Sequence, residues 1–134
     1  MNKNLIIILI LSIFNIYANS ISINNKFDMP IAIQTFVNAT NSGDSQSFVA
    51  NFTEDAYLRD WFYTFKGQEG VNIWNKSDNI GKNTHFDVLS IFKGKTDDEY
   101  ILKVKVSGNG FNGNSKIQFF LKDNFISKMI ILPW

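Results

Sequence analysis

Cysteine is absent from this 134-residue sequence, and histidine and arginine occur once each, as His85 and Arg59. The lack of cysteine excludes disulfide bonds, thiolate nucleophiles and cysteine-ligated metals. A single histidine, with no His-x-x-x-His spacing, argues against a dedicated metal site. The formal net charge is only +1 and the chain has no block of Lys and Arg, so nucleic acid is not expected as a partner.

Aromatic residues, by contrast, are abundant. The sequence has 13 Phe, 4 Tyr and 3 Trp, and hydrophobic residues make up 45% of it. This composition is typical of a globular protein, and the length suits one domain rather than two. Some of the aromatic side chains must fill a core, and the surplus indicates a cavity with aromatic walls.

The first twenty residues have the three-part pattern of a secretory signal peptide. Lys3 supplies the initial positive charge, residues 5–17 are almost wholly apolar, and Ala18 and Ser20 are the small residues that precede a cleavage site. The apolar run is shorter than the roughly 20 residues that span a bilayer, although an uncleaved membrane anchor is the alternative. We therefore expect a signal peptide at 1–20, a polar leader at 21–28 and a single domain at 29–133.

This pattern predicts a secreted or periplasmic protein that meets the membrane only through its signal peptide, before cleavage. Nucleotides and reduced cofactors are scarce outside the cytoplasm. The sequence therefore favours a binding role or an activity that needs no cofactor.

Two helices are expected after the leader. Asp28 is placed to cap the first, with Pro30 in its first turn and Gly43 at its end. Asp44 or Ser45 is placed to cap a short second helix. The side chains expected on the inner faces are Ile33, Phe36, Val37 and Thr40 in the first helix, and Phe48, Val49 and Phe52 in the second.

The rest of the chain predicts mostly strands. Ala56–Phe65 is rich in aromatic residues and predicts a strand or a hairpin, and Gln68–Ser77 predicts a third helix with Val71 and Trp74 inward. Four further strands are expected at Thr84–Lys93, Glu99–Ser107, Ser115–Lys122 and Phe125–Leu132.

This order of elements predicts an α+β fold. Its antiparallel sheet alternates apolar and polar residues, so one face is buried and the other is wetter. A curved sheet wrapped around the N-terminal helices would form a cone with an internal pocket.

Three segments, Ile33–Asp44, Phe52–Asp60 and Gly67–Trp74, resemble the opening helix, the first strand and the third helix of SnoaL-like proteins and ketosteroid isomerases. These families share the nuclear-transport-factor-2-like cone fold, which hosts many unrelated functions. The resemblance covers nearly all of residues 29–133. It implies the same cone and pocket for this chain.

The resemblance also assigns residues to roles. Asp60 matches the aspartate that is the general base of the isomerases. Phe36 stands where they have a tyrosine oxyanion donor, and Ile117 stands near the place of their second donor, a protonated aspartate. Because such donors supply a large share of the rate, ketosteroid isomerase activity is not expected.

Asp60 and His85 are the candidate catalytic residues. Asp60 lies beside Trp61 and Phe62, and an apolar pocket would raise the pKa of its carboxyl by desolvation; the alternative is a surface aspartate paired with Arg59 or a lysine. His85 is expected on one strand face with Asp87, Leu89 and Ile91. Next to an acid it could carry protons at neutral pH, and the alternative is a half-exposed packing residue.

The aromatic and apolar residues Phe36, Trp61, Trp74, Ile117 and Phe119 are the candidate ligand contacts, with filling of the core as the alternative for Trp74. Three functions fit these residues. The first is a binding protein for a small hydrophobic or aromatic molecule. The second is a cofactor-free isomerase, cyclase or dehydratase that uses Asp60 as its acid or base. The third is an interaction module, with a possible homodimer through the open face of the sheet.

The signal peptide gives a testable prediction. Protein isolated from its native host should begin near Ile21 and be found outside the cytoplasm, because the apolar run ends at a cleavage site after Ser20. Measurement of the intact mass tests this. A cytosolic protein that retains residues 1–20 would contradict it.

Overall fold

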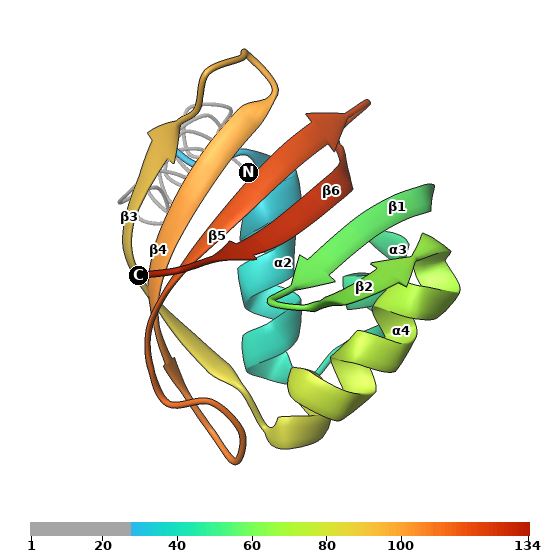
Figure 1. Cartoon of the computed structure of the whole chain (residues 1–134), viewed down its shortest axis with the longest axis vertical. Coiled ribbons are helices and arrows are strands. Elements are labelled where there is room, and N and C mark those ends of the chain that lie inside the picture. Colours follow the sequence, from blue (N-terminus) through green and yellow to red (C-terminus); the bar gives the residue numbers. More distant parts are fainter. Residues whose placement is uncertain (1–27) are drawn as a thin grey trace, which may run out of the picture.

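The computed structural model describes residues 28–134 (Figure 1). The expected signal peptide, and the expected leader up to residue 27, lie outside the described residues. The helices are α2 (Ile31–Ser42), α3 (Ser45–Ala50), α4 (Gly67–Asp78) and the short 3-10 helix η1 (Ile80–Lys82). The strands are β1 (Phe52–Asp60), β2 (Tyr63–Lys66), β3 (His85–Lys93), β4 (Glu99–Ser107), β5 (Gly113–Lys122) and β6 (Phe125–Leu132).

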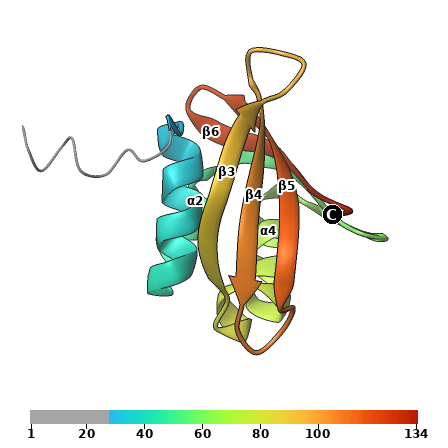
Figure 2. The same ribbon diagram turned by 90° about the vertical axis from the view of Figure 1, so that its left-hand side faces the viewer.

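The strands form one curved sheet in the order β2-β1-β6-β5-β4-β3. Neighbouring strands are antiparallel except for β1 and β6, which run parallel. Seen from the side, helix α2 lies along one face of strands β3, β4 and β5, which is the inner face of the sheet (Figure 2). The expected α+β fold with a curved sheet is confirmed, and the parallel pair is a feature that the sequence did not predict. None of the helices within residues 28–134 is long and apolar enough to cross a membrane.

Helix α2 begins two residues later than a cap at Asp28 would require. Pro30 is its N-cap rather than a residue of its first turn, and the Pro30 carbonyl accepts hydrogen bonds from the backbone N–H groups of Ile33 and Gln34. Proline suits this position because it has no N–H that would need a partner. At the other end Gly43 adopts a left-handed conformation with φ 71°, as predicted, and its N–H bonds to the Thr40 carbonyl.

Helix α3 is only six residues long and does not include Phe52, which opens β1 instead. Asp44 caps this helix, as predicted, and its Oδ1 accepts from the Ser47 N–H at 3.1 Å. Asn51 ends the helix by joining it to two other elements. Its side chain donates to the Ala32 carbonyl at 2.7 Å, and its own carbonyl accepts from the Ile126 N–H in β6.

A bulge between Val88 and Ser90 divides β3 into two halves. Before the bulge, His85 and Asp87 lie on the outer face of the sheet. After it, Ile91 packs against the core, so His85 and Ile91 do not share a face as the uninterrupted alternation predicted.

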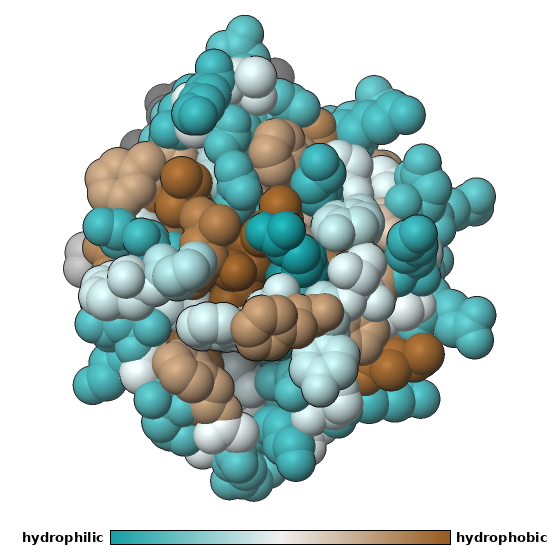
Figure 3. Space-filling view, viewed as in Figure 1, coloured by the Kyte–Doolittle hydropathy of each residue, from teal (hydrophilic) through white to brown (hydrophobic). Residues whose placement is uncertain are grey.

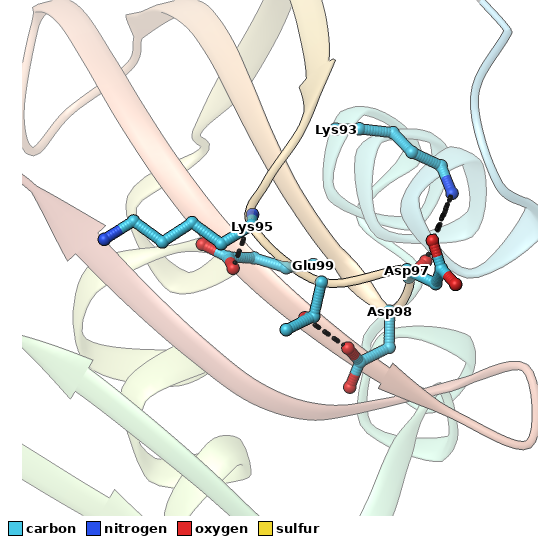
Figure 4. Close-up of polar contacts among 6 residues, drawn as sticks. Lys93, Lys95, Asp97, Asp98 and Glu99 are labelled. Atoms are coloured by element: carbon cyan, nitrogen blue, oxygen red, sulfur yellow. Dashed lines mark hydrogen bonds and ion pairs between the residues drawn. The ribbon is translucent and has the colours of Figure 1, made fainter.

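The turn between β3 and β4 is held by a group of polar contacts (Figure 4). Glu99 is buried, and it accepts hydrogen bonds from the Lys95 N–H at 2.9 Å and from Gln118 Nε2 at 2.5 Å. These bonds, the Gln118 bond first, lower the pKa of the Glu99 carboxyl. A Cβ at Gly94 would lie 2.3 Å from the Glu99 side chain, so a larger residue there would displace this carboxylate.

The closed end of the cone is filled by aromatic rings. Phe36 is fully buried on α2, and its ring centroid lies 5.3 Å from that of Phe48, 5.4 Å from that of Phe86 and 4.9 Å from that of Phe119. The Phe36 and Phe119 rings meet edge to face, an arrangement that aromatic quadrupoles favour. Phe36 therefore joins two helices to two strands.

We predict that Phe36→Ala lowers the free energy of unfolding by about 3–5 kcal/mol, because it leaves a cavity among these rings. Urea denaturation followed by circular dichroism measures the change. The control is Phe62→Ala, since the Phe62 side chain is 93% exposed and its removal should leave the midpoint nearly unchanged. Equal midpoints for Phe36→Ala and the wild type would show that the Phe36 ring is not part of the core.

Candidate functional site

The open end of the cone holds a cavity of about 450 Å³, which is within the usual range for small-molecule pockets. It lies between the end of α4 with η1 and the inner face of the sheet. The lining residues are Asp60, Trp61, Trp74, Asp78, Asn79, Lys82, Thr84, Phe86, Val106, Gly110, Phe111, Asn114, Ser115, Ile117, Ile131, Leu132 and Trp134.

The register of the sheet brings Asp60 to the inner face. Asp60 is paired with Ile131 on β6, Ile131 with Ile117 on β5, and Ile117 with Leu102 on β4. Residues in one such row point to the same side of a sheet. Leu102 is fully buried, whereas Ile117, Ile131 and Asp60 line the cavity.

Trp74 holds the Asp60 carboxylate in place. Trp74 Nε1 lies in α4 and donates a hydrogen bond to Asp60 Oδ2 at 2.9 Å. Partial burial raises the pKa of Asp60, and the nearby Asp78 carboxylate raises it further, whereas the hydrogen bond from Trp74 lowers it. The net pKa is above the ordinary aspartate value, so Asp60 is a weaker acid than a solvated aspartate.

Other polar groups lie at the same end of the cavity. Asp78 is one helical turn beyond Trp74, and the adjacent Asn79 is completely buried. The Asn79 Nδ2 group donates to Thr40 Oγ1 and to Asn75 Oδ1, each at 3.0 Å, but Asn79 Oδ1 has no hydrogen-bond partner. Within residues 28–134, no group of three or more His, Asp or Glu side chains could hold a metal ion.

Exposed aromatic side chains surround the mouth of the cavity. Trp61, Phe111 and Trp134 are 64%, 61% and 59% exposed, and all three are lining residues. Trp61 lies in the two-residue turn between β1 and β2 and has a φ of 51°, an uncommon value for a bulky residue. This turn places the indole beside Asp60 at the cavity instead of in the sheet.

The structure brings together four of the predicted site residues, Asp60, Trp61, Trp74 and Ile117, at the cavity. Phe36 and Phe119 are fully buried in the aromatic core and do not line it.

His85 lies outside the cavity, on the outer face of the sheet. Its side chain is 51% exposed, and its Nε2 is 3.4 Å from Asp87 Oδ1. The structure therefore does not place His85 next to Asp60.

Several lining residues were not predicted from the sequence, although the periodicity of the sequence indicates the position of two of them. Ser115 is two residues before Ile117 on β5, so strand alternation puts both on one face. Asp78 follows Trp74 by four residues, so helical periodicity puts both on one side of α4. Phe111 belongs to a loop of Gly and Asn residues, where no periodicity exists.

The outer face of the sheet is mixed in character. Figure 3 shows apolar side chains near the middle of this face, surrounded by hydrophilic ones. Lysine side chains cover aromatic rings here: Lys103 Nζ lies 5.3 Å from the ring centroid of Phe92, and Lys128 Nζ lies 4.9 Å from that of Phe120. The candidate site is thus the cavity on the inner face.

Comparison with known proteins shows similarity in structure. No protein-family model and no curated protein matches the chain. Among solved structures, it is similar to a candidate polyketide cyclase from Sinorhizobium meliloti, with 20% identity, a TM-score of 0.67, and coverage of 78% of this chain and 96% of that one. It is also similar to an NTF2-like protein of unknown function from Cytophaga hutchinsonii, with 14% identity, a TM-score of 0.64, and coverage of 75% and 85%.

A third similar structure is a Mycobacterium tuberculosis protein in complex with estradiol-17beta-hemisuccinate, with 14% identity, a TM-score of 0.68, and coverage of 78% of this chain and 92% of that one. These likenesses define the class of the fold. The chain has the NTF2-like, SnoaL-like fold that the sequence motifs predicted.

The hydrogen bond between Trp74 and Asp60 gives a prediction. In the wild type, the hydrogen bond from the Trp74 N–H stabilises the ionised form of Asp60. Trp74→Phe removes this bond and should therefore raise the pKa of the Asp60 carboxyl. Carbon-detected NMR titration of the carboxyl measures this shift. Trp61→Phe is the matched control, since Trp61 also lines the cavity but donates no hydrogen bond to Asp60. A fall in the pKa, or the same rise in both variants, would refute the role given to the Trp74 N–H.

Proposed function

We propose that this chain is an exported small-molecule-binding protein that holds a hydrophobic or aromatic ligand in its cone. One observation carries the proposal: the cavity of about 450 Å³ has aromatic and aliphatic side chains in its walls, with Asp60 and several other polar side chains among them. This combination is typical of small-molecule sites, because apolar walls supply affinity and a few polar groups fix orientation.

The solved neighbours support this proposal. The Mycobacterium tuberculosis protein of the same fold was solved with a steroid ester, and a cavity of this volume suits a rigid apolar body of that size. Export is proposed from the sequence of residues 1–20, whose charge, apolar run and small residues are those of a signal peptide.

A cofactor-free isomerase, cyclase or dehydratase is the second candidate, and the position of Asp60 favours it. A half-buried carboxyl with a raised pKa, inside a cavity, is suited to accept or donate a proton. Against it, Ile117 offers no donor to a developing oxyanion, and the Trp74 N–H already bonds to Asp60. Turnover of a bound compound that Asp60→Asn abolishes would favour the enzyme over the carrier.

The binding proposal is tested with two neutral probes, estradiol and naphthylethanol, by isothermal titration calorimetry. Both should bind the wild type, and Ser115→Phe should weaken binding by about tenfold or more, because the new ring fills the cavity. The control is Lys116→Phe, which adds the same ring on the outer face of the same strand and should leave affinity unchanged.

Thermal unfolding confirms that both variants are folded. If the wild type binds neither probe, or if Ser115→Phe binds them as tightly as the wild type does, the cavity is not a site for apolar molecules.

A further inference from the structure

The cavity wall at the end of α4 has more hydrogen-bond acceptors than donors. Trp74 gives Asp60 its one hydrogen bond among the described residues, to Oδ2, so Asp60 Oδ1 is unpartnered. Asp78 contributes a second, exposed carboxylate, whose Oδ2 accepts a hydrogen bond from Ser77 Oγ, and the buried Oδ1 of Asn79 has no partner. An acceptor in a poorly hydrated site is costly unless a donor reaches it.

The two carboxylates are also short of positive charge. The ion pairs of residues 28–134 are His85–Asp87 and Lys93–Asp97, and neither cavity carboxylate takes part in one. Lys82 is the single lysine among the lining residues, but its aliphatic stem lies beside Gly110, where an added Cβ would be 3.3 Å from the lysine Cβ. The charge of Asp60 therefore meets the charge of Asp78 without a cation between them.

The remaining walls suit an organic cation. Trp61, Phe86 and Phe111 supply aromatic surface on other sides of the same cavity, and so does Trp134, although Lys103 Nζ already lies 5.5 Å from the centroid of its ring. Aromatic faces attract cations through their quadrupole, most strongly where water is excluded, and they also pack against apolar rings.

From these features we infer that the ligand is a hydrophobic or aromatic amine, whose protonated nitrogen binds between Asp60 and Asp78 while its apolar body occupies the aromatic part of the cavity. This inference rests on the proposed binding function and specifies the ligand class. An ammonium group has donors and no acceptor, so it matches a wall that offers acceptors. Its charge offsets the repulsion between the two carboxylates, which a neutral ligand cannot do.

Three probes that share one naphthyl body test the inference at neutral pH by isothermal titration calorimetry: naphthylethylamine, naphthylethanol and naphthylacetate. The amine should bind the wild type about tenfold more tightly than the alcohol, and the acetate should bind most weakly. Asp60→Asn should weaken amine binding about tenfold while changing alcohol binding less than about twofold, because the amide keeps the shape and loses the charge.

Asp78→Asn should weaken amine binding in the same way but less, since Asp78 is exposed. Asp87→Asn is the control, because it removes a carboxylate on the outer face, and it should change nothing. An amine that binds no more tightly than the alcohol overturns the inference, whether both bind or neither does. Tighter binding of the acetate, or an equal loss of amine and alcohol binding in Asp60→Asn, overturns it too.

The alcohol separates this inference from the binding proposal on which it rests. If the alcohol binds as tightly as the amine, the cavity is a general site for apolar molecules. The binding proposal then holds, and only the inference of an amine ligand is refuted. Absence of binding by estradiol, naphthylethanol and naphthylethylamine alike removes the binding proposal itself.

Discussion

Strand β1 runs parallel to β6, the last strand of the sheet, and the arrangement of the open end depends on this contact. The pairing sets Asp60 opposite Ile131. It also sets the position of the β1–β2 hairpin, whose turn brings Trp61 to the cavity, and of α4, which packs against β1. A shift of one residue in this register would turn Asp60 to the outer face, because side chains alternate along a strand. The cavity and its carboxylate thus follow from one strand pair that joins distant parts of the chain.

The cone divides into a filled end and an open end because of the sizes of the side chains along the inner face. On β5, Phe119 fills the closed end, Ile117 lies at the boundary and the small Ser115 lies in the open part. Phe86 belongs to both parts, since its ring stacks on Phe36 and also lines the cavity. A buried aromatic core at one end stabilises the domain, which leaves the other end free to be hollow.

Much of the fold could be predicted from the sequence, because alternation and turn residues are local signals. Strands β4 and β6 have the predicted bounds, and α4 differs from its prediction by one residue at each end. Local signals failed where a contact from elsewhere decides the structure. Asn51 ends α3 by bonding to Ala32, which assigns Phe52 to a strand, and a bulge beside Leu89 changes which residues of β3 face inward. The parallel pairing of β1 with β6 has no local signal at all.

The candidate site was harder to predict, since alternation tells which face a side chain occupies but not its depth along the cone. Phe36 and Phe119 are on the inner face, as expected, yet they lie too deep to reach the cavity. Trp74 was a candidate ligand contact with filling of the core as the alternative, and the structure shows that one side chain can do both. Its ring is buried against Phe48, while its N–H reaches Asp60 at the cavity. Asp78 could have been predicted by extending the helical periodicity one turn beyond Trp74. Ser115 could have been predicted by extending the strand alternation two residues back from Ile117.

The distribution of the tryptophans has a spectroscopic consequence. The chain contains 3 Trp, and all of them, Trp61, Trp74 and Trp134, line the cavity. Indole emission is therefore confined to the one place where a guest molecule would enter, and no tryptophan elsewhere adds a constant background. One of these indoles bonds directly to the Asp60 carboxylate, so its excited state senses the ionisation of that group. The protein carries a built-in optical reporter of its own interior, and it needs no label.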